Sequence, residues 1–235
     1  MLPERPERAL ALGAHTKDVD IEAGGLLARW SAEGTEVTLA VVTDSSRGTS
    51  RVGQGRQELS RLRAEEQQRA AVILGYRDIR FLDLPDGELC SSERWRRPLA
   101  ALIRSVRPQV VLTYDPWRPY ELIADHRNIG LLVGDAIVAA RDPLFFPELL
   151  AAGFEPWRPD CLLLFAPAEP DAEADVTDFL ERKLDAVLAH RSHSVKRRLV
   201  GELDEAGLGE LRDLVRDDHR TGDGRAVERF RAWRL

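Results

Sequence analysis

Residues 9–20 read ALALGAHTKDVD, a short apolar run that gives way abruptly to polar side chains. The run Ala9–Ala14 is typical of a strand that is buried on both faces of a parallel sheet. Beyond the polar residues, Ile21–Glu33 carries apolar side chains for the inner face of a helix, and Gly34 is placed to end that helix. The stretch therefore predicts a buried strand that ends near His15, a tight polar loop and a helix.

The same alternation of strand and helix patterns continues along the chain. Further strands are expected at Glu36–Val42, Ile79–Leu84, Val110–Tyr114 and Cys161–Phe165, and further helices at Gln57–Leu74, Trp95–Val106, Asn128–Ala140 and Val176–Ala189. Such alternation is typical of βαβ crossovers, so we predict an α/β, Rossmann-like fold with a mostly parallel sheet and helices on both faces. Functional sites in this architecture form beside the carboxyl ends of the strands. Polar residues follow the predicted strands there: His15, Asp44, Asp86 and Asp115.

The length of the chain and its last third bear on domain organisation. Residues 1–235 are expected to form a single domain, because this length lies near the upper end of one domain. From about residue 176 the chain is expected to be mostly helical. After the helix at Val176–Ala189, helical patterns are assigned to Leu208–Val215 and Ala226–Trp233, which flank a polar break at residues 221–224.

The composition excludes several classes of protein. Apolar residues make up 43% of the chain and charged residues 31%, which is typical of a globular protein. The net charge is −6 and basic residues are mixed with acidic ones, so no nucleic-acid partner is expected. No apolar run approaches the roughly 18 residues of a membrane helix, and no signal peptide is recognised, so no membrane partner is expected. Cys90 and Cys161 lie far apart in the sequence, which favours a reducing cytoplasm over a disulfide framework.

Two short clusters hold the residues with the clearest chemistry. His15 and Asp18 lie three residues apart on the tight loop after the first strand, and Asp125 and His126 follow the fourth strand and a long loop. Two histidines and one carboxylate make a familiar catalytic zinc set that leaves a coordination position for water. A histidine after a strand is also common as a helix cap or as a hydrogen-bonding core residue, so spacing alone leaves both interpretations open.

The order of several motifs resembles the LmbE-like, or PIG-L, family of N-acetylglucosaminyl deacetylases. The first motif of that family reads Ala-His-Pro-Asp-Asp-x-Glu before a Gly-Gly pair, and residues 14–20 and 24–25 read AHTKDVD and GG. Further matches come in the family's order at residues 42–44 (VTD), 63–66 (RAEE), 74–75 (LG), 82–87 (LDLPDG), 107–108 (RP) and 111–116 (VLTYDP). The family's His-Pro-Asp-His is matched by residues 123–126 (IADH), and its late Lys-x-x-Ala-x-x-x-His helix by Lys183–His190. The resemblance spans nearly the full chain.

The resemblance implies a zinc-dependent hydrolase that removes an N-acyl group from an amino sugar or a sugar conjugate. Carried over to this sequence, the metal ligands are His15, Asp18 and His126, and Asp125 is the acid beside the second ligand histidine. Arg63 and Asp86 match positions that contact the sugar, and Asp44 is a further candidate for substrate binding. Asp44 and Asp86 can also be read as turn residues, since an aspartate after a strand commonly caps a helix or forms an Asx-turn.

The sequence departs from the family at Lys17, which replaces the aspartate that acts as general base on the metal-bound water. Ile123 also replaces the first histidine of the second motif, and Thr16 replaces a proline. Three interpretations of Lys17 are open: a neutral Lys17 acts as the base, or an aspartate such as Asp20, Asp44 or Asp125 replaces it, or the protein binds metal without turnover. Lys17 can also simply point to solvent.

The remaining histidines and the class of protein also allow more than one interpretation. His190 and His193 are expected at the surface, with a role for His190 in the cleft as the alternative, and no role is assigned to His219. Apart from a deacetylase, the sequence allows a catalytically impaired homologue that binds metal and a sugar. A dinucleotide-binding oxidoreductase ranks last, because no Gly-x-Gly-x-x-Gly follows the first strand. The loops Arg47–Gly55 and Trp117–Ala124 are expected to determine the substrate, and a homo-oligomer remains open.

Overall fold

The centre of the protein is a sheet of seven strands in the order β3-β2-β1-β4-β5-β7-β6. The computed structural model describes residues 2–49, 52–192, 209, 210, 212, 213, 216, 217, 219 and 221–235. The strands are β1 (Arg8–Gly13), β2 (Glu36–Thr43), β3 (Asp78–Leu84), β4 (Val110–Tyr114), β5 (Cys161–Phe165), β6 (Ala172–Asp175) and β7 (Val227–Arg234). Strands β1 to β5 pair in parallel, as the alternating pattern predicts. Because β1 lies between β2 and β4, the apolar run Ala9–Gly13 is fully buried.

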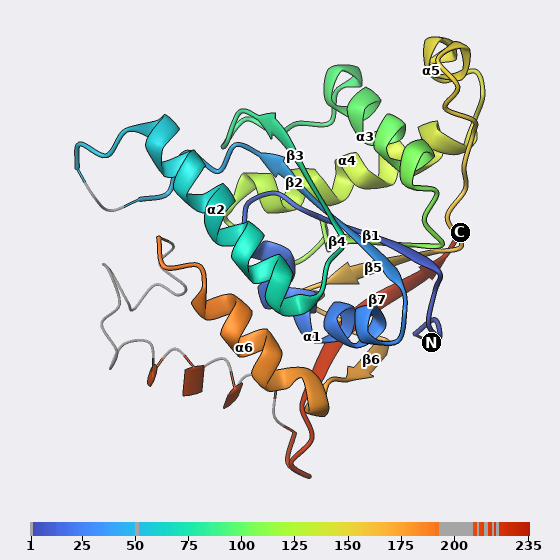
Figure 1. The fold of residues 1–235 in the computed structure, drawn as a ribbon. Helices are drawn as coiled ribbons and strands as arrows, with labels where there is room; N and C mark the ends of the chain where they lie inside the picture. The colour runs from blue at the N-terminus through green and yellow to red at the C-terminus, as the bar shows by residue number, and fades with distance from the viewer. Residues whose placement is uncertain are drawn as a thin grey trace.

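Helices cover both faces of the sheet, which confirms the predicted fold class. Helices α1 (Asp18–Ala32), α2 (Arg56–Leu74) and α6 (Leu180–Leu188) contact one another on one face. Helices α3 (Glu93–Val106) and α4 (Ala124–Arg141) pack together on the other, and the short α5 (Pro147–Ala151) follows them (Figure 1). A 3-10 turn, η1 (Thr177–Phe179), precedes α6, so the helix expected at Val176–Ala189 is shorter than its pattern suggests.

The prediction of a helix at Ala226–Trp233 is wrong, because this segment is the strand β7. It runs antiparallel to both β5 and β6 and lies between them. Apolar side chains in Val227–Arg234 stand at residues 227, 230, 232 and 233, a spacing that matches the helical period and the strand period in part, and eight residues are too few to distinguish the two. Pairing with the open edge of β5 supplies the hydrogen bonds that decide the outcome. Of the helix expected at Leu208–Val215, residues 209, 210, 212 and 213 are described and are helical, and the other four lie outside the described residues.

The helices α1 and α4 begin several residues earlier than the sequence patterns suggest. Helix α1 starts at Asp18 instead of Ile21, and α4 starts at Ala124 instead of Asn128. Both polar clusters singled out in the sequence therefore lie where a helix begins, directly beyond the carboxyl end of a strand. Helical geometry, rather than loop conformation, fixes the positions of Asp18, Asp125 and His126.

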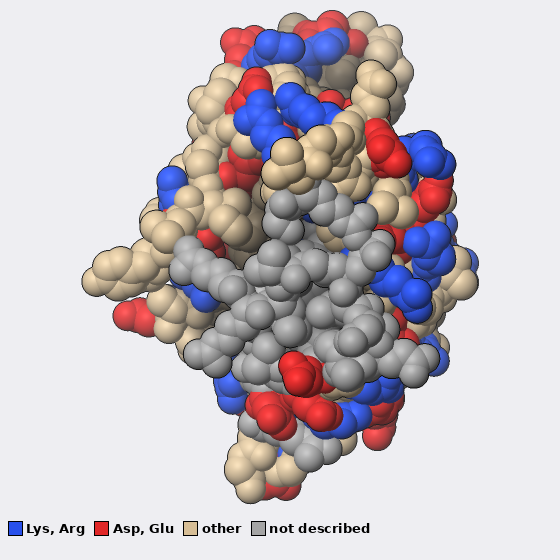
Figure 2. Space-filling view, turned by 90° about the vertical axis from the view of Figure 1, so that its left-hand side faces the viewer, with Lys and Arg blue, Asp and Glu red and all other residues tan. Residues whose placement is uncertain are grey.

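The charge of the surface and the apolar character of the helices bear on nucleic-acid and membrane partners. On the face drawn in Figure 2, described basic and acidic side chains lie next to one another, as they do along the sequence. Among the described residues, no helix is both long enough and apolar enough to cross a bilayer.

Helix α4 approaches the end of β4 so closely that only a glycine fits between them. A Cβ atom on Gly130 would lie 2.5 Å from the carbonyl oxygen of Tyr114 and 2.8 Å from Cδ of Pro116. Gly134, one turn later on the same helix, faces open space, because a Cβ atom there would meet no described neighbour within 4 Å. Gly130 therefore sets the distance between β4 and the helix whose first turn holds Asp125 and His126.

We predict opposite effects for alanine at these two glycines. Gly130→Ala should lower the free energy of unfolding by about 1–3 kcal/mol, because the new methyl group must push α4 away from β4. Gly134→Ala should raise it by roughly 0.5–1 kcal/mol, because alanine favours the helix and meets no neighbour. Denaturant unfolding of both variants measures the difference, and equal midpoints would show that the contact at Gly130 has no energetic weight.

Candidate metal centre

The loop between β1 and α1 is held in one conformation by contacts from two other elements. Lys17 precedes α1 with φ of 73°, in the left-handed region that side chains rarely adopt. Its backbone N–H donates to Oε1 of Gln67 on α2 at 2.8 Å, and the N–H of Thr16 donates to Oγ of Ser45 at 3.0 Å. The carboxylate of Asp18 accepts the N–H of His15 at 2.8 Å. These bonds fix the directions in which His15 and Asp18 point.

His15, Asp18 and His126 converge on one point, as the sequence motifs predict. Nδ1 of His15 lies 3.4 Å from Oδ2 of Asp18, and Nε2 of His126 lies 3.5 Å from the same oxygen. In a tetrahedral zinc site with metal–ligand distances of about 2.0–2.2 Å, neighbouring ligand atoms are about 3.3–3.5 Å apart. The ligand atoms of all three side chains lie within 4.8 Å of one another. Two imidazoles and one carboxylate at this spacing fit a divalent ion of the zinc type.

The second ring nitrogen of His15 faces two carboxylates. Nε2 lies 3.1 Å from Oδ1 of Asp86 and 3.3 Å from Oδ2 of Asp125. Asp125 also accepts the backbone N–H groups of Gly87 at 2.7 Å and Leu89 at 3.2 Å, so both of its oxygens have partners. Carboxylates on the far nitrogen of a histidine orient the ring and leave the other nitrogen for a metal. His15, Asp86 and Asp125 also have ligand atoms within 4.8 Å of one another.

The charges around the cluster determine the protonation of its members. Burial alone would lower the pKa of His15, but hydrogen bonds with Asp125, Asp18 and Asp86 outweigh burial and raise it well above its ordinary value. Burial would raise the pKa of Asp18, but the charges and hydrogen bonds of His126 and His15 hold it far below its ordinary value. Asp18 is thus ionised, as a metal ligand must be.

His126 is held by two residues that the sequence analysis does not single out. The ring of Tyr114, the last residue of β4, stacks on the ring of His126 with 4.0 Å between the centroids. Oε2 of Glu121 lies 3.8 Å from Nδ1 of His126, on the side away from Asp18. Tyr114 could have been found from its place at the end of a predicted strand, whereas Glu121 lies in a loop whose path the sequence does not give.

Lys17 is partly buried beside the cluster, so its side chain is not fully exposed to solvent. Burial lowers the pKa of its amine, Asp18 acts in the opposite direction, and Arg63 lowers the pKa further. Among the described residues, the Lys17 amine makes no hydrogen bond or ion pair.

Asp20 does not join the cluster. Its side chain is fully buried, where Oδ2 accepts from Nε2 of Gln67 at 2.7 Å and lies 2.8 Å from Nε2 of His190. The expectation that His190 lies at the surface is therefore wrong, because α6 packs its end against α1 and α2. Gln67 connects the two groups, since it binds the N–H of Lys17 with its oxygen and Asp20 with its nitrogen. His193 lies outside the described residues, and His219 lies near Nζ of Lys183 at 2.7 Å.

Arg63 and Asp44 lie beside the cluster but have other partners. The guanidinium of Arg63 is buried and donates to the backbone carbonyls of Ser45, Arg47 and Gly48, so it holds the loop after β2. Oδ1 of Asp44 accepts the backbone N–H of Ser46 at 3.0 Å and of Asp86 at 3.3 Å. The interpretation of Asp44 as a turn residue is therefore correct for this oxygen.

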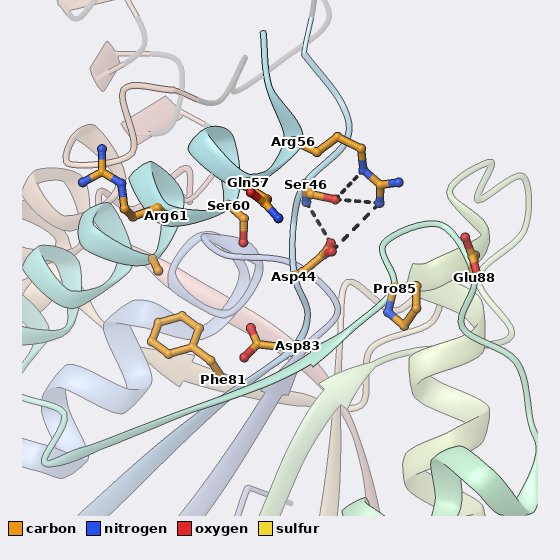
Figure 3. A pocket seen from close by; sticks show the side chains of 11 residues that line it. Asp44, Ser46, Arg56, Gln57, Ser60, Arg61, Phe81, Asp83, Pro85 and Glu88 are labelled. Atoms are coloured by element: carbon orange, nitrogen blue, oxygen red, sulfur yellow. Dashed lines mark hydrogen bonds and ion pairs between the residues drawn. The ribbon is translucent and has the colours of Figure 1, made fainter.

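The other oxygen of Asp44 faces a hollow between α2 and the edge strand β3 (Figure 3). Its volume is about 930 Å³, within the range of sites for small molecules. Arg56 extends over it, with Nη2 2.8 Å from Oγ of Ser46 and 3.9 Å from Oδ2 of Asp44. Asp83, Glu88 and Arg61 also line the hollow, so its wall is rich in groups that can bind hydroxyls.

We predict that the contacts of Gln67 are important for stability. Gln67→Leu should lower the free energy of unfolding by about 1–3 kcal/mol, because the N–H of Lys17 and the carboxylate of Asp20 lose a partner in a buried position. Gln57→Leu, at an exposed position on the same helix, is the control and should change little. Chemical denaturation measures both, and a Gln67 variant as stable as its control would contradict the role assigned to this side chain.

The fold and the cluster together define a Rossmann-like α/β protein with a His-Asp-His cluster, spaced so that it could hold a metal ion, at the carboxyl edge of its parallel strands. Residues 10–137, more than half of the chain, match the family model described as PIG-L, GlcNAc-PI de-N-acetylase, and the chain belongs to this family. The resemblance found in the sequence motifs is thereby confirmed, as is the prediction of a family that hydrolyses C–N amide bonds.

Relatives of known function and structure agree with this assignment. The chain is 35% identical over 186 residues to diacetylchitobiose deacetylase of Thermococcus kodakarensis, with 79% of this chain and 70% of that protein covered. It is 34% identical over 173 residues to 1D-myo-inositol 2-acetamido-2-deoxy-alpha-D-glucopyranoside deacetylase of Streptomyces avermitilis, with 63% of this chain and 58% of that protein covered. The solved structure of N,N′-diacetylchitobiose deacetylase from Pyrococcus horikoshii superposes with a TM-score of 0.87 at 28% identity, over 97% of this chain and 84% of that one.

Proposed function

We propose that this protein is a zinc-dependent hydrolase that removes an N-acyl group, such as acetyl, from an amino sugar or a sugar conjugate. The observation that carries the proposal is the spacing of 3.4 and 3.5 Å between Asp18 and the two imidazoles, which suits a tetrahedral ion. The named activities of the relatives support the substrate class, since both act on acetamido sugars or their oligomers. Free Cys90 and Cys161 support a cytoplasmic location.

In this proposal His15, Asp18 and His126 hold the zinc ion. When bound, zinc supplies a Lewis acid that polarises water and the acyl oxygen. Asp86 and Asp125 orient His15 through its Nε2, while Tyr114 and Glu121 orient His126. We assign Asp125 this orienting role in place of proton transfer, because both of its oxygens already accept backbone hydrogen bonds.

The substrate side of the site is assigned to the loop after β2 and the hollow beside it. We propose that Asp44 and Arg56 contact the sugar from the wall of the hollow. Arg63 acts indirectly, because its donors hold the carbonyls of residues 45, 47 and 48. Asp86 connects the cluster with the loop after β2. One of its carboxylate oxygens faces His15 and the other accepts the N–H of Arg47 at 2.7 Å. We also propose that residues 1–235 form one domain, because β7, the last strand in the chain, belongs to the same seven-stranded sheet as β1, the first.

The general base is the one function for which the family's residue is missing, and we assign it to Glu22. Asp20 is excluded because its carboxylate is buried against Gln67 and His190. Glu22 lies one helical turn after Asp18, on the same side of α1. Its carboxylate interacts electrostatically with both Asp18 and His126. Among the described residues its carboxylate has no hydrogen-bond partner, and burial raises its pKa above the ordinary value although the charges of Lys183 and Arg118 act in the opposite direction.

We predict that zinc binding depends on the cluster in a graded way. The purified protein should hold stoichiometric zinc, and Asp18→Ala should lose it. Asp125→Asn should weaken zinc binding by about 10–100-fold, because His15 loses part of the support for its ring. Asp44→Asn, outside the cluster, is the control. Zinc retained by the Asp18 variant after dialysis, measured by mass spectrometry, would exclude the proposed ligand set.

We further predict that the turnover of an N-acetylated amino sugar depends on Glu22. Glu22→Gln should lower kcat by about 10²–10⁴-fold with zinc content unchanged, which is the size of a lost general base. Glu33→Gln, beyond the end of the same helix, is the control. Lys17→Asp should raise kcat, because it restores the family's carboxylate next to Asp18.

The alternative is a homologue that binds metal and a sugar without turnover, and the replacements at Lys17 and Ile123 favour it. The natural protein, Glu22→Gln and Lys17→Asp together distinguish a hydrolase from a homologue without turnover. A zinc-loaded natural protein without hydrolysis of any N-acetyl amino sugar, together with a large gain in Lys17→Asp, would show that the natural chain is a disabled hydrolase and that Glu22 is no base.

A further inference from the structure

A second hollow lies beside β5 and β7, and it shares no lining residue with the cavity beside Asp44. It has a volume of about 350 Å³. The residues that matter for its chemistry are Asp115, Trp117, Pro119, Glu169, Arg231 and Trp233. They come from the loop after β4, the loop after β5 and the last strand β7, so the hollow exists only because β7 is a strand. Nothing in the metal centre uses these side chains.

Two tryptophans form an exposed aromatic surface in this hollow. The rings of Trp117 and Trp233 lie 5.4 Å apart between centroids, tilted by 33°, and the two residues are 58% and 46% exposed. Each ring thus contacts the other and still presents a face to solvent. Large aromatic faces left in water are costly unless a ligand covers them, and tryptophan is enriched where one end of a contact is apolar and the other is wet.

Charged groups border the aromatic surface and are held in place. Oδ1 of Asp115 accepts the backbone N–H of Trp117 at 3.0 Å, which leaves the other carboxylate oxygen available. Arg231 is oriented by Asp171, with 3.3 Å between Nε and Oδ2. An apolar platform with carboxylates and a guanidinium at its border suits a ligand that has one apolar face and polar groups around its edge. A pyranose ring has this character, since its C–H bonds present an apolar face and its hydroxyls lie around the edge.

The size and the position of the hollow narrow the range of ligands that it can bind. A volume of about 350 Å³ is near the lower limit of small-molecule sites, so it suits a single ring rather than an oligomer. The next residue along the loop, Arg118, interacts electrostatically with Glu22 and Tyr114 beside the candidate metal centre. The same loop therefore borders the hollow with Trp117 and the metal centre with Arg118.

We propose that Trp117 and Trp233 form a carbohydrate subsite that binds a non-reacting sugar ring of a glycan or glycoconjugate substrate. This inference rests on the proposed function for the identity of the substrate, but the binding itself requires no metal. The subsite would favour substrates of two or more rings over a single N-acetyl amino sugar, because only the former can reach the platform and the metal together.

The test is calorimetric titration of the full chain, after removal of metal by a chelator, with N-acetylated chito-oligosaccharides of two to four rings. We expect saturable binding that Trp117→Ala weakens at least tenfold and that Trp117→Phe, which keeps an aromatic face, changes less than threefold. Trp95→Phe, at a partly buried tryptophan of α3, is the matched control and should leave binding unchanged. Because the protein is free of metal, a failure of hydrolysis does not affect this result.

Three outcomes would overturn the proposal. The first is a natural protein that does not bind the oligosaccharides, and the second is a Trp117→Ala variant that binds as well as the natural protein. The third is a loss of self-association in Trp117→Ala, seen by sedimentation velocity and without any change in sugar binding, which would show that a second copy of the chain covers the tryptophans. In the zinc-loaded protein, Trp117→Ala should also raise KM for a disaccharide and leave kcat and the KM for N-acetylglucosamine unchanged.

Discussion

A single buried carboxylate, that of Asp18, imposes the arrangement of the whole centre. An ionised group that is 2% exposed must be compensated, because an unpaired charge in the interior costs several kcal/mol. The compensation comes from the N–H of His15 and from the imidazoles of His15 and His126, which approach one carboxylate oxygen from different elements. Each imidazole is in turn supported on its far side, by Asp86 and Asp125 or by Glu121. The same oxygen that demands compensation is the one best placed to bind a cation.

Two aspartates that lie close together in the sequence differ in their surroundings, and their contacts give them different roles. Asp18 and Asp20 are two residues apart on one helix, and helical geometry turns them to different sides. Asp18 meets His126 across the end of the sheet, whereas Asp20 meets Gln67 and His190 in the interior. Proximity in the sequence to a metal ligand is therefore poor evidence for a catalytic group. The contacts of each carboxylate, and whether an oxygen remains available, are better evidence.

Much of the fold and the core of the site could be predicted from the sequence, and particular residues show why the rest could not. Buried parallel strands give largely apolar runs, so β1, β2, β4 and β5 and the position of His15 beyond β1 follow from pattern, whereas the partly buried edge strand β3 follows from its place in the alternation of strands and helices. The convergence of His126 on Asp18 follows only from the family resemblance, since the loop before α4 has no regular pattern. The strand β7 at Val227–Arg234 escapes prediction because its partner, the edge of β5, lies more than sixty residues away in the chain. Asp20 and His190 pair across 170 residues, and local sequence carries no signal for such a contact.

The replacement at Lys17 removes a carboxylate of the family's first motif, and the contacts of Asp18 with the two histidines are present beside it. Its backbone keeps the left-handed conformation that starts α1, and Gln67 holds its N–H, so the direction of Asp18 does not depend on the side chain at this position. Strained backbone and buried polar groups persist where surrounding structure over-determines them, and they gather at functional sites. In the function that we propose, metal binding and proton transfer therefore fall to separate residues. The arrangement of His15, Asp18 and His126 depends on contacts made by the backbone and by the carboxylates behind the histidines, whereas proton transfer is assigned to Glu22 in place of the missing aspartate.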